Sequence, residues 1–111
     1  KIKTKKNNEN IEIIIKDNAL GIEKSILNKI FEPYFTTKHQ YQGTGLGLYM
    51  TRQIITTSMK GEIHAENSYF KHNTIQYFGA KFIISLPTNL DWLWLKVCDI
   101  ILLYNLKFLI K

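Results

Sequence analysis

Two stretches of this chain carry apolar side chains at every second position, and they enclose a segment whose apolar residues repeat at helical spacing. The first stretch runs from Ile11 to Ile15, and the second from Gly79 to Leu86. A period of two is typical of β-strands that bury one face, whereas Leu46–Met59 has the period of an amphipathic helix. Because such strands cover their apolar face with another layer, we expect an α/β (α+β) two-layer sandwich.

The other elements follow from breaks in these periods. Asn7–Asn10 is a turn, which predicts a hairpin between strands at Lys1–Lys5 and Ile11–Ile15. A short amphipathic helix is expected at Glu23–Ile30, ended by Pro33, and a structured loop at Phe31–Gly43. The second helix has Leu46, Met50 and Ile54 on one stripe, with Leu48, Ile55 and Met59 near it, and ends at Lys60–Gly61. A strand at Glu62–Glu66 and a long hairpin connection at Asn67–Phe78 follow. This hairpin makes the predicted sheet mixed and largely antiparallel.

Charge and cysteine content narrow the classes of function. The net charge is +6, but every basic residue except Arg52 is a lysine, and the lysines are scattered along the chain. This pattern argues against a nucleic-acid-binding function, while a positive charge suits a site that attracts a polyanion. Cys98 is the sole cysteine, which excludes an internal disulfide and favours a cytoplasmic setting.

Three glycines precede the second predicted helix, at Gly43, Gly45 and Gly47. Glycines let the backbone approach an anion closely, and the unpaired N–H groups at a helix start favour negative charge. The run is therefore a candidate phosphate-binding loop, although a flexible turn would have the same composition. It is not a Walker loop, because no Gly-Lys-Ser/Thr follows, and it does not follow a strand as a Rossmann fingerprint would.

Asp17 ends the first apolar strand, where its carboxylate would be half-buried. A buried carboxylate needs a hydrogen-bond partner, which the exocyclic amino group of a purine would provide. Alternatively, Asp17 and Asn18 form a turn, with Asp17 capping the segment that leads to Glu23. From Asp17 alone, the turn is the simpler interpretation.

Taken together, four motifs between Ile11 and Pro87 resemble the ATP-binding domain of sensor histidine kinases. In order, they are the first glycine box at Ile13–Ile22, the phenylalanine box at Lys29–Lys38, the second glycine box at Gly43–Leu48, and the final strand at Gly79–Pro87. The phenylalanine box separates this family from the chaperone, gyrase and mismatch-repair ATPases that share its nucleotide fold. The implied architecture is a Bergerat-type ATP-binding fold, truncated at its N-terminus, over residues 1–88.

The resemblance also implies a set of nucleotide contacts. Asp17 would accept a hydrogen bond from the adenine amino group and so select ATP over GTP, Gly21 would let the backbone pass close to the base, and Phe31 and Phe35 would anchor a lid. Other implied contacts are backbone N–H groups of Thr44, Gly45 and Leu46 on the phosphates, Lys38 near the γ-phosphate, and Ile22, Gly43 and Gly47 in the same site. The chemistry would be transfer of the γ-phosphate to a histidine, through positioning and charge neutralisation.

Several family features are expected outside this sequence. The Asn motif that supplies the main Mg²⁺ ligand, with a catalytic acid beside it, should lie upstream. A histidine-phosphotransfer dimerisation domain and a response regulator would be partners of the ATP-binding domain. The ATP-binding domain would lie in the cytoplasm, either in a cytoplasmic protein or as part of a membrane-bound sensor. Ala19 replaces a usual glycine, which would restrict a left-handed φ. The fragment alone is not expected to autophosphorylate, so a non-catalytic remnant or regulatory module, or another ATPase of the superfamily, stays as an alternative.

Residues 89–111 form a hydrophobic tail. Its length approaches that of a membrane span, but Lys96, Asp99 and Lys107 interrupt it. The three charged residues fall in one narrow sector of a helical wheel, which suits a helix buried in protein or lying in a membrane interface. Unselected translation after a frameshift or a lost stop codon is the interpretation that we favour slightly.

Overall fold

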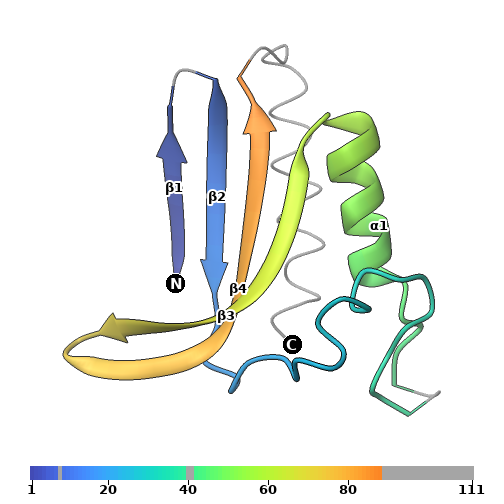
Figure 1. Cartoon of the computed structure of the whole chain (residues 1–111), viewed down its shortest axis with the longest axis horizontal. Helices are drawn as coiled ribbons and strands as arrows, with labels where there is room; N and C mark the ends of the chain where they lie inside the picture. The colour runs from blue at the N-terminus through green and yellow to red at the C-terminus, as the bar shows by residue number, and fades with distance from the viewer. Residues whose placement is uncertain (8, 40–41, 89–111) are drawn as a thin grey trace.

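The computed structural model describes residues 1–7, 9–39 and 42–88, and within them four strands form one sheet (Figure 1). The elements are β1 (Ile2–Lys6), β2 (Asn10–Lys16), α1 (Gly47–Gln53), a π-helical turn η1 (Ile54–Ser58), β3 (Glu62–His72) and β4 (Ile75–Pro87). The strand order is β1-β2-β4-β3, and each of the three pairings is antiparallel. The predicted strands and the β1–β2 hairpin are confirmed, and the expectations for residues 89–111 fall outside the described residues.

The core lies between one face of the sheet and the helical segment α1–η1. Its buried members are Ile15 from β2, Ile63 from β3, Ile84 and Leu86 from β4, and Ile55 and Met59 from the helical segment. Ile13 and Phe82 pack against this cluster from the same face. The period-two pattern of the two apolar strands therefore identified the buried face correctly.

The helical segment buries a different stripe from the predicted one. Thr51, Ile55 and Met59 are buried, whereas Met50, expected on the apolar stripe, is 54% exposed. After Gln53 the helix widens, and the Met59 N–H bonds to the Ile54 carbonyl, five residues back. Met50 precedes this widening, so its exposure follows from the orientation of α1 itself, which turns Thr51 rather than Met50 toward the sheet.

The segment predicted as a helix at Glu23–Ile30 is instead a series of turns. Its backbone hydrogen bonds each span three residues, from Ile26 N to Glu23 O, from Lys29 N to Ile26 O and from Glu32 N to Lys29 O. A short segment gains too few hydrogen bonds to offset helix nucleation, which accounts for the difference. Ile30 is nevertheless buried, so the apolar spacing marked the correct inward side.

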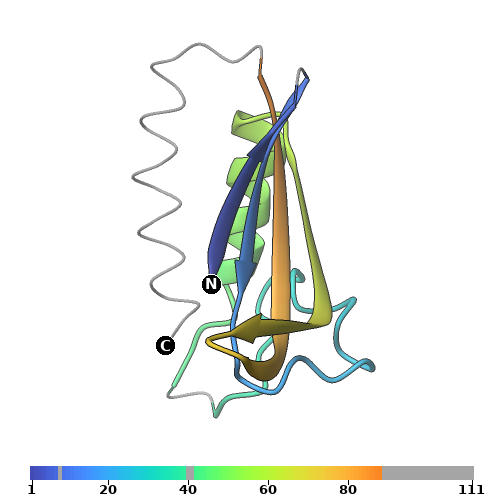
Figure 2. The ribbon, with the colours of Figure 1, turned by 90° about the vertical axis from the view of Figure 1, so that its left-hand side faces the viewer.

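The predicted connection at Asn67–Phe78 is mostly a continuation of β3 and β4. The strands turn at Asn73 and Thr74, both with positive φ, as a two-residue hairpin turn requires. Figure 2, viewed from the β1 side, shows the sheet nearly edge-on and the far part of this ribbon turning across its lower end. Within residues 1–7, 9–39 and 42–88, no helix is long and apolar enough to cross a membrane.

Candidate functional site

Asp17 lies where β2 ends, and the backbone of β4 holds its carboxylate. The Asp17 N–H donates to the Ala80 carbonyl at 3.0 Å, and Asp17 Oδ1 accepts from the Ala80 N–H at 2.9 Å and from the Ala19 N–H at 3.0 Å. The bond to Ala19 is the predicted turn. Asp17 Oδ2 has no hydrogen-bond partner among the described residues, so one oxygen of this half-buried carboxylate can accept from a ligand.

Gly79 leaves the space that Asp17 occupies. A Cβ built on Gly79 would lie 2.0 Å from the Asp17 carbonyl oxygen and 2.5 Å from Asp17 Oδ1. Both distances are far below van der Waals contact, so no side chain fits at this position without moving the end of β2. Gly79 therefore allows β4 to pass close to the end of β2.

The loop after Asp17 is pinned by Asn67 on β3. The Asn67 amide accepts from the Ile22 N–H at 2.8 Å and donates to the Ile22 carbonyl at 2.7 Å. Gly21 has φ +80°, and a Cβ there would lie 2.7 Å from Asn67 Oδ1. The φ restriction considered for Ala19 does not arise, because the left-handed residues are Leu20 and Gly21. Sequence reasoning missed Asn67, because a polar residue does not stand out in a strand as polar as β3.

An open cavity of about 330 Å³ lies between this loop and the start of α1. Its walls include four residues predicted to bind a nucleotide: Gly21, Ile22, Phe35 and Lys38. Apolar surface comes also from Ile26, Ile30 and Leu48, which were not among the predicted nucleotide contacts, although Ile30 and Leu48 lie within the two boxes. Asp17 and the segment 43–47 lie outside this lining, so the cavity joins only part of the predicted set.

The second glycine box packs on the backbone of the phenylalanine box. Gly45 has φ +69°, and a Cβ there would lie 2.5 Å from the carbonyl carbon of Tyr34 and 2.7 Å from the Phe35 carbonyl oxygen. A Cβ on Gly43 would lie 3.8 Å from Lys38 Cδ, whereas one on Gly47 would meet nothing within 4 Å. The two motifs therefore form one folded unit.

The same unit is tied to α1, which begins at Gly47 as predicted. The guanidinium carbon of Arg52 lies 5.7 Å from the centroid of the Phe31 ring, a cation–π contact. Leu46, at the N-cap, provides no side-chain hydrogen bond to the first turn, and Thr44 is exposed. The backbone N–H groups in the first turn of α1 therefore donate no hydrogen bond to an N-cap side chain. No cluster of three or more potential metal-ligating His, Cys, Asp or Glu residues occurs in the described part of the chain.

Comparison with known proteins places this arrangement in a family. Residues 1–90 match the profile described as histidine kinase-, DNA gyrase B- and HSP90-like ATPase. The chain is 40% identical over 77 residues to the two-component sensor PprA of Pseudomonas aeruginosa, covering 69% of this chain and 7% of that protein. It is also 40% identical over 77 residues to the signal transduction histidine-protein kinase AtoS of Escherichia coli, covering 69% and 11%. The chain thus spans only a small part of these relatives.

Solved structures agree with the sequence matches. The catalytic domain of the histidine kinase ThkA superimposes with a TM-score of 0.59 at 30% identity, covering 78% of this chain and 50% of that one. A mycobacterial sensor histidine kinase, MprB, gives a TM-score of 0.60 at 21% identity, covering 78% and 54%, and so supports the fold alone. The resemblance drawn from the four motifs is thereby confirmed, and the chain belongs to the ATPase domain family of two-component sensor histidine kinases.

Proposed function

We propose that this chain binds ATP as part of the catalytic domain of a sensor histidine kinase and presents the γ-phosphate for transfer to a histidine. The observation that carries the proposal is the carboxylate of Asp17. Backbone N–H groups of Ala80 and Ala19 hold Oδ1, and Oδ2 has no partner among the described residues. A rigid acceptor with one unused oxygen is suited to an amino donor such as that of adenine.

The fit of ATP to the surrounding residues is supported by close backbone approaches. Gly21 and Gly45 both have positive φ, and a side chain at either position would collide with its neighbours. In the proposed arrangement Gly21, Ile22 and Phe35 contact the base and its lid, and Lys38 lies near the γ-phosphate. N–H groups of Thr44, Gly45 and Leu46 would hold the phosphates, with Gly43 and Gly47 permitting their approach. We propose that the sheet and helix are the C-terminal part of a Bergerat-type fold.

The chain's own contribution to phosphoryl transfer would be positioning and neutralisation of charge. Bound ATP would supply the phosphoryl group, and Mg²⁺ would accompany it. The described residues offer no group of three acidic or histidine side chains for that ion. The proposed partners are a histidine-phosphotransfer dimerisation domain and a response regulator, in the cytoplasmic part of a sensor.

The adenine assignment is tested by Asp17→Asn, measured by calorimetric titration with ATP and Mg²⁺. The substitution keeps an acceptor oxygen for Ala80 and Ala19 but replaces the other oxygen with an NH₂ group, which would face the adenine amino donor. We expect ATP affinity to fall by about thirtyfold, corresponding to about 2 kcal/mol. Glu62→Gln, an exposed carboxylate on β3 paired with His64, is the matched control and should bind as the unsubstituted chain does.

Unchanged ATP affinity in a folded Asp17→Asn chain would refute the adenine assignment. Far-ultraviolet circular dichroism and the urea midpoint establish whether the variant is folded. A parallel titration with GTP gives a second readout, because GTP presents an acceptor where adenine presents its amino group. The ratio of the Kd for GTP to the Kd for ATP should therefore be smaller in the variant than in the unsubstituted chain.

A further inference from the structure

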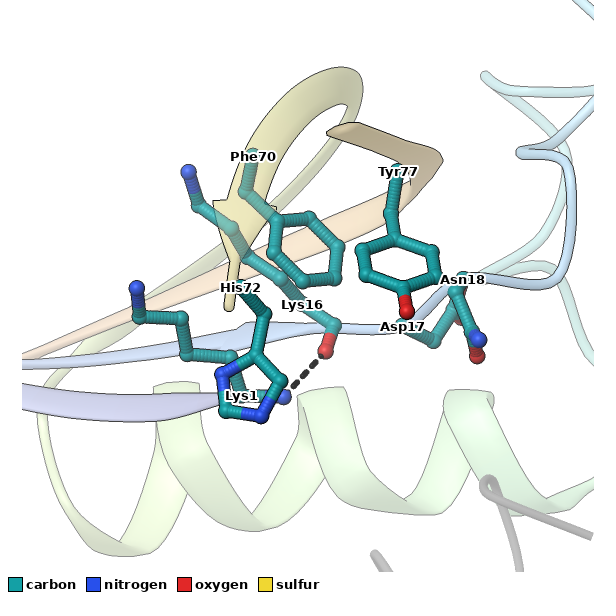
Figure 3. Close-up of a pocket in the computed structure, with 7 residues that line it drawn as sticks. All are labelled: Lys1, Lys16, Asp17, Asn18, Phe70, His72 and Tyr77. Carbon is teal, nitrogen blue, oxygen red and sulfur yellow. Dashed lines mark hydrogen bonds between the residues drawn. The ribbon is translucent and has the colours of Figure 1, made fainter. Parts of the chain in front are cut away.

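A second cavity, of about 290 Å³, lies where the far part of the β3–β4 ribbon meets the ends of β1 and β2. Phe70, His72 and Tyr77 come from the ribbon, and Lys1 and Lys16 from the neighbouring strand ends (Figure 3). An adjoining cavity of about 280 Å³ shares Lys1, Lys16 and Phe70 and adds Lys3 and Lys71. The two cavities form one continuous region, here called the basic-aromatic cavity.

The basic-aromatic cavity is on the side of the sheet opposite α1. Ile15 points into the core beneath the helix, so the next residue, Lys16, points to the other face. On β4, Phe82 packs against the core, and Tyr77, an odd number of residues away, faces the opposite side. Phe70 is the direct register partner of Tyr77 and shares that face. The cavity is therefore separated by the sheet from the one that Gly21 and Lys38 line.

Two aromatic rings form one wall of this cavity. The ring centroids of Phe70 and Tyr77 lie 5.6 Å apart with an interplanar angle of 28°, a stacked arrangement. Both side chains are half-buried, so part of their ring surface stays open to the cavity. Rigid aromatic surface of this kind binds a planar ring by stacking.

The rest of the lining is strongly basic. Lys1, Lys3 and Lys16 lie beside the rings, and none has a carboxylate within salt-bridge distance in the described part of the chain. Lys1 Nζ donates to the Lys71 carbonyl at 3.4 Å, which links the strand end to the ribbon. Asp17 also lines the cavity; its Oδ1 accepts from backbone N–H groups, and its Oδ2 is the oxygen assigned to adenine in the proposed function. Unpaired cations beside aromatic rings favour an anion.

We propose that the basic-aromatic cavity is a second ligand site, for a small planar aromatic compound that carries a phosphate or carboxylate group. The ring stacks against Phe70 and Tyr77, and the anionic group pairs with the lysine ammonium groups. Both a nucleoside monophosphate and an aromatic acid have this chemistry. The rings and lysines that would bind this ligand are not among the residues that line the first cavity, although Asp17, the proposed adenine acceptor, lines the basic-aromatic cavity too.

The test is a titration of the isotopically labelled chain with phenyl phosphate, followed by amide chemical shifts in NMR spectra. Inorganic phosphate and phenol are titrated in parallel, because each carries one half of the proposed ligand. Saturable shifts at Phe70, His72 and Tyr77 are expected with phenyl phosphate, with weaker binding of the two half-ligands. Benzoate and uridine monophosphate then distinguish a carboxylate ligand from a nucleotide.

Two pairs of variants make the result specific. Phe70→Leu should raise the Kd for phenyl phosphate by about tenfold, whereas Tyr69→Leu, an exposed ring on the other face, should not. Lys16→Gln should raise it by about fivefold, whereas Lys5→Gln, on the same side of β1 but outside the cavity, should not. Spectra of the free variants show whether each is folded.

Three outcomes would overturn the proposal. Binding of inorganic phosphate as tight as that of phenyl phosphate would show that the rings contribute nothing. Equal effects of Tyr69→Leu and Phe70→Leu would mean nonspecific contact with exposed aromatic surface. Loss of binding in Lys38→Gln would place the anion in the first cavity instead, and ATP affinity in the same variant would show independently whether that cavity binds nucleotide.

Discussion

Replacing Gly79 with alanine tests how closely β4 approaches the end of β2. The φ of Gly79 is not in the left-handed region, so alanine can adopt its backbone conformation, and the obstacle is space alone. The new Cβ would lie 2.0 Å from the Asp17 carbonyl oxygen, so the strand end must move by about 1 Å to reach van der Waals contact. That movement strains the paired hydrogen bonds between Asp17 and Ala80, at 3.0 and 2.9 Å.

Overpacking and partial loss of these bonds together should lower the free energy of unfolding by about 3 kcal/mol. In a domain of this size the melting temperature should then fall by roughly 15 °C. Urea unfolding followed by circular dichroism measures the first quantity, and a thermal scan the second. ATP affinity should fall in the same variant, because the carboxylate of Asp17 is displaced.

Gly47→Ala is the matched control, because a Cβ at Gly47 meets nothing within 4 Å and lies in the first turn of α1. Alanine there should raise the free energy of unfolding by about 0.5 kcal/mol, since it restricts the unfolded chain and favours the helix. A Gly79→Ala chain within about 0.5 kcal/mol of the unsubstituted chain would refute the argument, because ordinary surface substitutions cause changes of that size.

Two further substitutions test contacts that hold the site. Asn67→Ala removes both hydrogen bonds to Ile22 and should cost about 2 kcal/mol in urea unfolding, with faster hydrogen exchange at the Ile22 amide, while the exposed Asn18→Ala should change neither. Thr51→Val removes a buried hydroxyl that bonds to a helix carbonyl at 2.9 Å, and it should lower the free energy of unfolding by about 1 kcal/mol. The hydroxyl of Thr56 makes the same kind of bond at 2.8 Å but is exposed, so Thr56→Val should lower that free energy by less than about half as much. Equal effects of the two threonine substitutions would show that burial does not set the cost.

The strands and the glycine positions could be predicted because local chemistry determines them. Ile13 and Ile15 face the core as their spacing indicates, since a period of two leaves one apolar side. Gly21 and Gly45 occupy left-handed conformations in which a side chain would be strained. Such positions can be predicted from a sequence, because few residues other than glycine can adopt these backbone conformations.

Other features depend on contacts between distant segments, and the sequence did not reveal them. Asn67 pins the loop at Ile22, but an isolated asparagine in a strand has no local signature. The ribbon beyond Asn67 was predicted as a connection, because its aromatic residues gain their role only through cross-strand pairing with a partner strand. The exposed position of Met50 depends on how α1 is rotated against the sheet, with Thr51 buried instead, and apolar spacing within the helix could not determine that rotation.

The strand order has a consequence for the route by which the chain folds. β1 pairs with β2, and β3 with β4, across short turns, so each hairpin can form within about 1–10 μs. The contact between β2 and β4 joins Ile13 to Ile84 and must close nearly the whole described chain, which makes it the slow step. Asp17 meets Ala80 only when those two strands join. We therefore expect the contact between Asp17, the proposed nucleotide acceptor, and Ala80 to form late in refolding. Destabilising changes along the β2–β4 pairing should slow folding rather than only hasten unfolding.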